Sequence, residues 1–100
     1  SYGDAMQYFE RAVRVDPRSL PALVNFGDAL IKTGRPEAAV PYLLRARDIR
    51  PDEPAIYLNL TRAYLGLHQY GAARETYETL VGLDAQLAKE IDHRVFRTGF

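Results

Sequence analysis

The sequence predicts an all-α fold made of stacked helix pairs, and three observations lead to that prediction. The chain repeats itself at an offset of 34 residues, which aligns Ala5 with Ala39 and Ala73, Phe9 with Leu43 and Tyr77, and Val15 with Ile49 and Leu83. Within each repeat, apolar residues recur in three- and four-residue steps, the spacing of one helix face. Glycine or proline separates the apolar runs, as at Gly34 and Pro51, because these residues end helices readily. A fixed period of two helices is typical of repeat proteins, in which each unit buries its apolar face only against its neighbours.

The first expected helix, within residues 1–19, begins where Ser1 and Asp4 have the spacing of a helix-capping box, with aspartate in place of glutamate. Its apolar stripe is Tyr2, Ala5, Phe9 and Ala12. This helix is the second half of a unit, so the helix that would normally cover its stripe does not precede it. We expect a second copy of the chain, a neighbour's C-terminal helix or upstream sequence to cover the stripe, and we favour a homodimer. The alternative is that the helix closes the stack alone.

The first complete unit is predicted at residues 20–53. The apolar positions of its first helix are Leu23, Phe26, Gly27 and Leu30, and those of its second helix are Ala39, Leu43, Ala46 and Ile49. Alanine at position 39 is small because two helix backbones approach each other closely there. We expect Leu43 and its counterpart Phe9 to be deeply buried. Pro41 lies inside the second helix, where it removes one backbone hydrogen bond, so we expect a slight kink on the outer side.

The second complete unit is predicted at residues 54–87, and it begins at Pro54, where a missing N–H costs nothing in the first turn. Its apolar positions are Tyr57, Leu60 and Tyr64, followed by Ala73, Tyr77, Leu80 and Leu83. Residues 88–100 are expected to form an amphipathic helix, because Leu87, Ile91 and Val95 recur in four-residue steps. This helix would cap the last unit, or it would be the first helix of a truncated further unit.

These positions resemble the tetratricopeptide repeat family, whose unit is a helix–turn–helix of the same length with leucine, glycine, tyrosine, alanine and proline at fixed places. The resemblance covers most of residues 1–87 and implies about two and a half repeats and about six helices in a right-handed superhelix. The sequence departs from the family pattern at Thr61 for glycine, Leu80 for alanine and Ala85 for proline. We expect these changes to loosen local packing without changing the fold.

The composition excludes several function classes. The formal net charge is zero, which argues against a general nucleic-acid binder because such proteins neutralise many phosphates. Cysteine is absent and no apolar run reaches the length of a membrane span. His68 and His93 have no carboxylate or hydroxyl at a spacing that predicts a catalytic triad or a metal site. We therefore expect no enzymatic activity, no cofactor, no metal and no membrane insertion.

Shape remains as the source of function, because stacked helix pairs form a concave groove that serves as an extended binding surface. We expect the first helix of each pair to line this groove and to bind a peptide or helix of a partner protein. The candidate partner-binding residues lie away from the core stripes: Val24, Asn25, Asp28, Ile31, Lys32, Leu58, Asn59, Arg62 and Leu65. The alternative is that the C-terminal helix folds back and covers them. The resemblance also raises a carboxylate clamp, which we do not expect because Val24 and Leu58 replace its lysines.

Two further features stay open. A strip of arginines is expected on the convex side: Arg11, Arg14, Arg45, Arg47 and Arg50. Acidic neighbours such as Glu10 dilute it, so a solvated face is favoured over an anion site.

The alternative function is an assembly unit of a larger scaffold, which self-associates through the uncovered first helix. Residues 1–100 form one domain that is compatible with a fragment of a longer protein, and the compartment stays open, with the cytoplasm favoured.

Overall fold

The computed structural model describes residues 2–97, with Tyr2 described by its backbone alone, so the predicted cap at Ser1 lies outside the described residues. The helices are α1 (Tyr2–Val15), α2 (Leu20–Lys32), α3 (Pro36–Ile49), α4 (Pro54–Gly66), α5 (Tyr70–Leu83), α6 (Ala85–Ala88) and the 3-10 helix η1 (His93–Phe96). No strand occurs within residues 2–97. The predicted all-α fold class is therefore confirmed.

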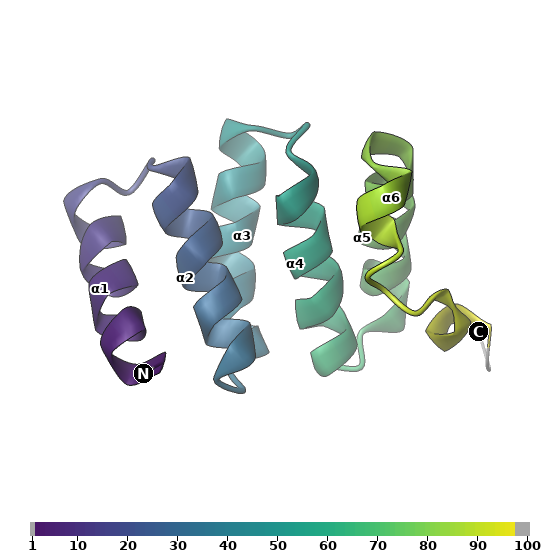
Figure 1. Ribbon diagram of the computed structural model, residues 1–100, viewed down its shortest axis with the longest axis horizontal. Coiled ribbons are helices and arrows are strands. Elements are labelled where there is room, and N and C mark those ends of the chain that lie inside the picture. The colour runs from purple at the N-terminus through teal and green to yellow at the C-terminus, as the bar shows by residue number, and fades with distance from the viewer. Residues whose placement is uncertain (1, 98–100) are drawn as a thin grey trace.

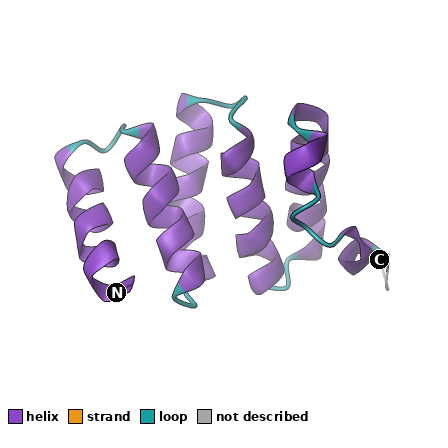
Figure 2. Cartoon of the chain, in the orientation of Figure 1, coloured by secondary structure: helices purple, strands orange, loops and turns teal. Residues whose placement is uncertain are grey.

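The helices form an elongated stack of antiparallel neighbours, with extents of 41 × 26 × 20 Å. In Figure 1, α2, α4 and α6 lie in the front layer, and α3 and α5 lie behind them. Each helix packs on the next one along the chain, and α2 also contacts α4 directly. The connections between the long helices are short (Figure 2). The α2–α3 pair falls within the predicted unit 20–53, and the α4–α5 pair within 54–87.

Local sequence explains where these helices begin and end. The Ser19 side chain accepts a hydrogen bond from the Ala22 backbone N–H, which makes Ser19 the N-cap of α2. Gly34 adopts a φ of 81° after α2, a left-handed conformation that glycine reaches without a side-chain clash. His68 holds the same repeat position after α4 with a φ of 58°. The next residue closes both turns, because Arg35 N–H donates to Leu30 and Gln69 N–H donates to Tyr64.

The contact between α2 and α3 is a close steric fit. Ala39, Leu43 and Ala46 are all 0% exposed. A Cβ atom at Gly27 would lie 2.7 Å from the Leu43 Cδ2 atom, so a larger residue at this position would force the Leu43 side chain to shift. The expectation that Phe9 is equally buried is wrong, because Phe9 is only half-buried. Helix α3 continues through Pro41, which is exposed to solvent.

In the contact between α4 and α5, hydrogen-bonded threonines occupy the place that Gly27 and its neighbours occupy between α2 and α3. Thr61 holds the repeat position of Gly27, and its hydroxyl lies 2.7 Å from the Tyr57 carbonyl oxygen and 2.8 Å from the Thr76 hydroxyl. Both threonines are buried, and Thr76 is also within hydrogen-bond distance of the Ala73 carbonyl oxygen. The predicted loosening at Thr61 does not occur here, because a satisfied hydroxyl pair fills the space.

The expected single helix over residues 88–100 is wrong within the described residues. Helix α6 ends at Ala88, and the chain then turns into η1. The Asp92 side chain accepts a hydrogen bond from the Arg94 N–H, which makes Asp92 the N-cap of η1 and starts a separate helix there. The turn lets Ala88, Ile91 and Phe96 all reach one apolar cluster with Leu58 and Leu80. The segment 85–97 therefore covers the last helix pair, as a cap is expected to do, by a different backbone path.

Candidate partner-binding surfaces

The side of α2 and α4 that packs on neither α3 nor α5 is called the inner face below, and the predicted partner-binding residues all belong to these two helices. On α2, Asn25 and Lys32 are exposed and Val24 and Ile31 are half-buried. Lys32 forms an ion pair with Asp28, with 2.9 Å between the Lys32 Nζ and Asp28 Oδ2 atoms. The α2 half of the inner face thus keeps the mixed apolar and polar character expected of a recognition surface.

The α4 half of the inner face is partly covered by the chain itself. Leu58 is 7% exposed and Asn59 is 6% exposed, so these two candidate partner-binding residues are buried rather than open to a partner. Leu58 packs in one cluster with Ile91 of the C-terminal segment. For Leu58 the structure shows the alternative considered above, in which the end of the chain folds back. Leu65 remains half-buried.

Arg62 is held by the same segment. Its Nη2 atom lies 2.9 Å from the Glu90 Oε1 atom, and the two side chains are 36% and 53% exposed. An ion pair this accessible to water adds at most about 1 kcal/mol to stability. The predicted cation of the groove is therefore paired, in a contact that is weak enough to exchange.

A small cavity of about 200 Å³ opens where the N-terminal ends of α2 and α4 meet. Its lining residues are Leu20, Pro21, Val24, Asn25, Glu53 and Ala55. The cavity places an apolar wall beside the amide of Asn25 and the carboxylate of Glu53. Its size suits one side chain of a partner rather than a whole small molecule.

The outer face of α1 is the second candidate surface. Ala5, Phe9 and Ala12 are partly exposed, although the residues at the same repeat positions in α3 are fully buried. Tyr8 is 70% exposed and Val15 is 80% exposed, whereas the exposed residues Val81 and Leu83 on α5 reach only 41%. The Tyr2 side chain, which was expected on this stripe, lies outside the described side chains. The stripe is therefore present from Ala5 onward and is only partly covered.

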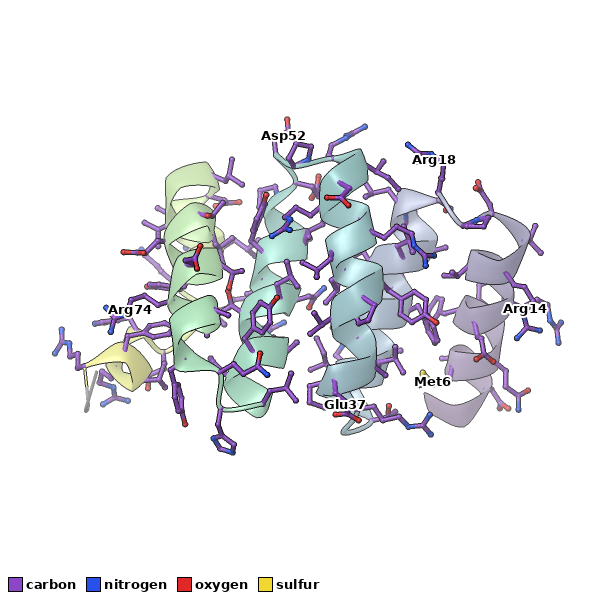
Figure 3. The ribbon with its side chains drawn as sticks, turned by 180° about the vertical axis from the view of Figure 1, so that it is seen from behind. Met6, Arg14, Arg18, Glu37, Asp52 and Arg74 are labelled. Carbon is purple, nitrogen blue, oxygen red and sulfur yellow. The ribbon has the colours of Figure 1, made fainter. Side chains whose placement is uncertain are left out.

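The third candidate surface is a groove between α1 and α3, called the outer groove below, which the sequence did not predict. It consists of two cavities of about 440 Å³ each. Both cavities are lined by Glu10, Phe26 and Tyr42, so they adjoin. Figure 3 shows Met6 on the side of α1 that faces α3. The only sequence signal for this groove was the predicted strip of arginines, because Arg14 and Arg45 line it.

The charged and imidazole groups outside these surfaces form small local contacts. The His68 Nδ1 atom lies 3.0 Å from the Tyr70 hydroxyl, in the turn where His68 was expected. Hydrogen bonds from Arg94 lower the pKa of the exposed Asp92 carboxyl to about 2. Within residues 2–97, no three His, Asp or Glu side chains gather in a way that could hold a metal ion. In the same range, no helix is both long and apolar enough to cross a membrane.

Comparison with known proteins gives a consistent result. The chain is 36% identical over 77 residues to anaphase-promoting complex subunit 7 of Arabidopsis thaliana, which covers 76% of this chain and 12% of the relative. It is 31% identical over 81 residues to the RNA polymerase-associated protein CTR9 of Saccharomyces cerevisiae, covering 81% of this chain and 7% of that protein. It is 29% identical over 86 residues to the Vi polysaccharide export protein VexE of Salmonella typhi, covering 86% of this chain and 12% of that protein.

The chain thus spans only 7% to 12% of the length of these relatives. A sequence model described as "Tetratricopeptide repeat" matches residues 1–48 and 33–90, which together include α1 to α6. The matched residues carry the 34-residue period and the helix pairs described above. The chain belongs to the tetratricopeptide repeat family.

Proposed function

We propose that the chain binds a peptide or helix of a partner protein on the inner face, mainly along α2 and at the junction of α2 with α4. Tetratricopeptide repeats are generally non-catalytic, protein-binding repeats, so the chain is a protein–protein interaction module in this general sense. The observation that supports the finer proposal is the cavity of about 200 Å³ beside Val24 and Asn25. An apolar hollow with polar groups at its rim is typical of an interaction site and is not expected on a helix face that only contacts water.

The inner face suggests the chemistry of the ligand. An aliphatic side chain would enter the cavity against Val24 and Pro21, because both present apolar surface there. The Asn25 amide can donate and accept hydrogen bonds, which suits the main chain of an extended peptide. Lys32, at the other end of α2, is 52% exposed at its side chain and would pair with an acidic group. Leu58 and Asn59 are too buried in the described structure to take part.

The test begins with peptides selected from a random library displayed against the folded chain. The selected peptide is titrated by calorimetry into the native chain and into the variants Val24→Asp, Asn25→Ala and Lys32→Ala. We expect at least a tenfold weaker Kd for Val24→Asp and a smaller loss for the two polar variants. Lys89→Ala is the matched control, because Lys89 is exposed outside the inner face. Unchanged affinity in all three inner-face variants would exclude this face.

We also propose self-assembly through the outer face of α1 as a second function, with a second copy of the chain as the occupant. The support is the contrast between Phe9, which is partly exposed, and Leu43, which is 0% exposed at the same repeat position. Tyr8 and Val15 extend the uncovered stripe. A stripe of this kind can pair with itself across a twofold axis, because such an axis brings the same patch of both copies together.

Sedimentation velocity over a wide concentration range tests the assembly. The native chain should gain mass with concentration, whereas Tyr8→Lys and Val15→Lys should remain monomeric. Val81→Lys is the control, since Val81 is an exposed valine on α5 that lies outside the stripe. A native chain that stays monomeric at every concentration, with full helix content, excludes assembly and leaves α1 as the end of the stack.

A further inference from the structure

We infer that the outer groove is a second docking surface, which takes a short acidic peptide with an aromatic or aliphatic residue at its centre. The groove lies between α1 and α3, whereas the inner face belongs to α2 and α4. The inference is therefore independent of the function proposed above. It rests on three properties of the groove: a continuous cavity, a rigid apolar floor and an excess of cations at the rim.

The cavity is large enough for a peptide. Its two parts measure about 440 Å³ each and adjoin at Phe26 and Tyr42, and ligand pockets commonly measure about 300–1,000 Å³. One end lies near Gly3 and Arg35, and the other lies near Arg14 and Arg45. The 11 steps from Gly3 to Arg14 along α1 correspond to about 17 Å of helix. About five residues of an extended peptide span that length.

The floor of the groove is apolar and firmly placed. Phe26 is 5% exposed and comes from the packed face of α2. The Tyr42 ring meets it edge to face, with 4.8 Å between the ring centroids. This arrangement is favourable for aromatic pairs and fixes both rings. An apolar side chain from a ligand would rest on these two rings at the centre of the groove, where the two cavities join.

The rim carries more positive than negative charge. Arg14, Arg35 and Arg45 line the groove together with one carboxylate, that of Glu10. Glu10 and Arg14 are 3.9 Å apart, and their side chains are 58% and 76% exposed, so water screens their pairing and a ligand can compete with it. The Arg45 guanidinium stands 5.4 Å from the centre of the Tyr42 ring, which holds a cation directly beside the apolar floor.

These positions define the ligand. Arginines at both ends of the groove favour a carboxylate at each end of the peptide, because guanidinium groups bind carboxylates through paired hydrogen bonds. The rings of Phe26 and Tyr42 favour an apolar residue between the carboxylates. A nucleic acid fits less well, because its affinity comes from neutralising many phosphates and the formal net charge of the chain is zero.

The probe is a fluorescein-labelled octapeptide with two acidic residues on each side of a central Leu-Phe pair, followed by fluorescence anisotropy. Binding should be saturable, and Arg45→Glu should weaken it at least tenfold, with a smaller loss for Arg14→Glu. Arg50→Glu makes the same charge change at an exposed residue that does not line the groove, and it should alter the Kd by less than twofold. A peptide with lysines in place of the acidic residues should not bind.

Amide shifts in a two-dimensional NMR titration show where the peptide binds. Shifts at Met6, Tyr42 and Arg45 support the outer groove, and thermal melts confirm that each variant is folded. The inference is overturned by an absence of saturable binding at millimolar peptide. Equal losses in Arg45→Glu and Arg50→Glu overturn it too, as does tighter binding of a single-stranded oligonucleotide at the same residues. Val24→Asp on the inner face should leave this binding unchanged, so the two surfaces fail or succeed separately.

Discussion

Replacing Gly27 with alanine should destabilise the chain, although the same replacement at Gly71 should stabilise it. The two glycines lie in helices α2 and α5 and differ in what surrounds them. An added Cβ at Gly27 would lie 2.7 Å from Leu43 Cδ2 and 2.8 Å from Leu43 Cγ, whereas nothing lies within 4 Å of a Cβ at Gly71. The comparison therefore isolates the steric contact between α2 and α3.

The magnitude follows from two opposing contributions. Alanine in a helix is about 0.5–1 kcal/mol more favourable than glycine, and Gly71→Ala should show a gain up to this size. At Gly27 the new methyl group overpacks the core, which costs about 1–3 kcal/mol, because it would lie 2.7 Å from the side chain of Leu43, which is 0% exposed. The two variants should therefore differ by about 1–3 kcal/mol in the free energy of unfolding.

Urea denaturation measured by circular dichroism gives both free energies, and a difference of 1 kcal/mol corresponds to about 4–8 °C in Tm for a domain of this size. Adding Leu43→Ala to the Gly27→Ala variant should remove most of the steric penalty, so the two changes should be non-additive. If Gly27→Ala proves as stabilising as Gly71→Ala, the close approach of α2 and α3 at this level is refuted.

Three further predictions concern the core and the C-terminal turn. Leu43→Ala should lower the free energy of unfolding by about 2–5 kcal/mol, because a fully buried leucine leaves a cavity; a midpoint in urea near that of the native chain would contradict the helix register. Thr61→Val should cost about 1 kcal/mol by the same assay, with Thr61→Val and Thr76→Val together costing less than their sum; full additivity would contradict a shared hydrogen bond. Arg94→Ala should raise the pKa of Asp92 from about 2 toward 3.8 in an NMR titration, because its side-chain hydrogen bonds are the main cause of the lowering. Because this pKa is lower in the folded chain, the stabilisation is present above about pH 4 and is lost between about pH 4 and pH 2; an unchanged titration in the variant would contradict the contact.

The repeat period predicted the helix pairs because the same packing position recurs in each unit. Ala39, Leu43 and Ala46 read as one stripe in the sequence, and they are fully buried in the structure. Such positions are set by neighbours that are close in the chain, so a pattern of three- and four-residue steps contains the necessary information. The family resemblance depends on the same repeated positions, and the match to the family's sequence model confirms it.

The surfaces were less predictable, because they depend on contacts between distant segments. The periodic spacing of Leu87, Ile91 and Val95 predicted a helix, but α6 ends at Ala88 and a separate 3-10 helix begins after its N-cap Asp92. The resulting turn brings Ile91 onto Leu58, which no pattern within α4 reveals. The cavities of the outer groove include residues from α1, α2 and α3, so sequence reasoning found its arginines without finding the hollow between them.

The two helix pairs achieve the same geometry with different chemistry, and this has a consequence for how such a chain can change by recombination. In one pair Gly27 receives Leu43, and in the other Thr61 meets Thr76. In a hybrid that paired α4 with α3, the Thr61 side chain would collide with Leu43. In a hybrid that paired α2 with α5, Thr76 would face Gly27 and would lose its hydrogen bond with Thr61. Each helix pair is therefore a matched set: exchange of whole units within a gene keeps this contact intact, whereas a crossover between the two helices of a unit lowers the stability by about 1–3 kcal/mol.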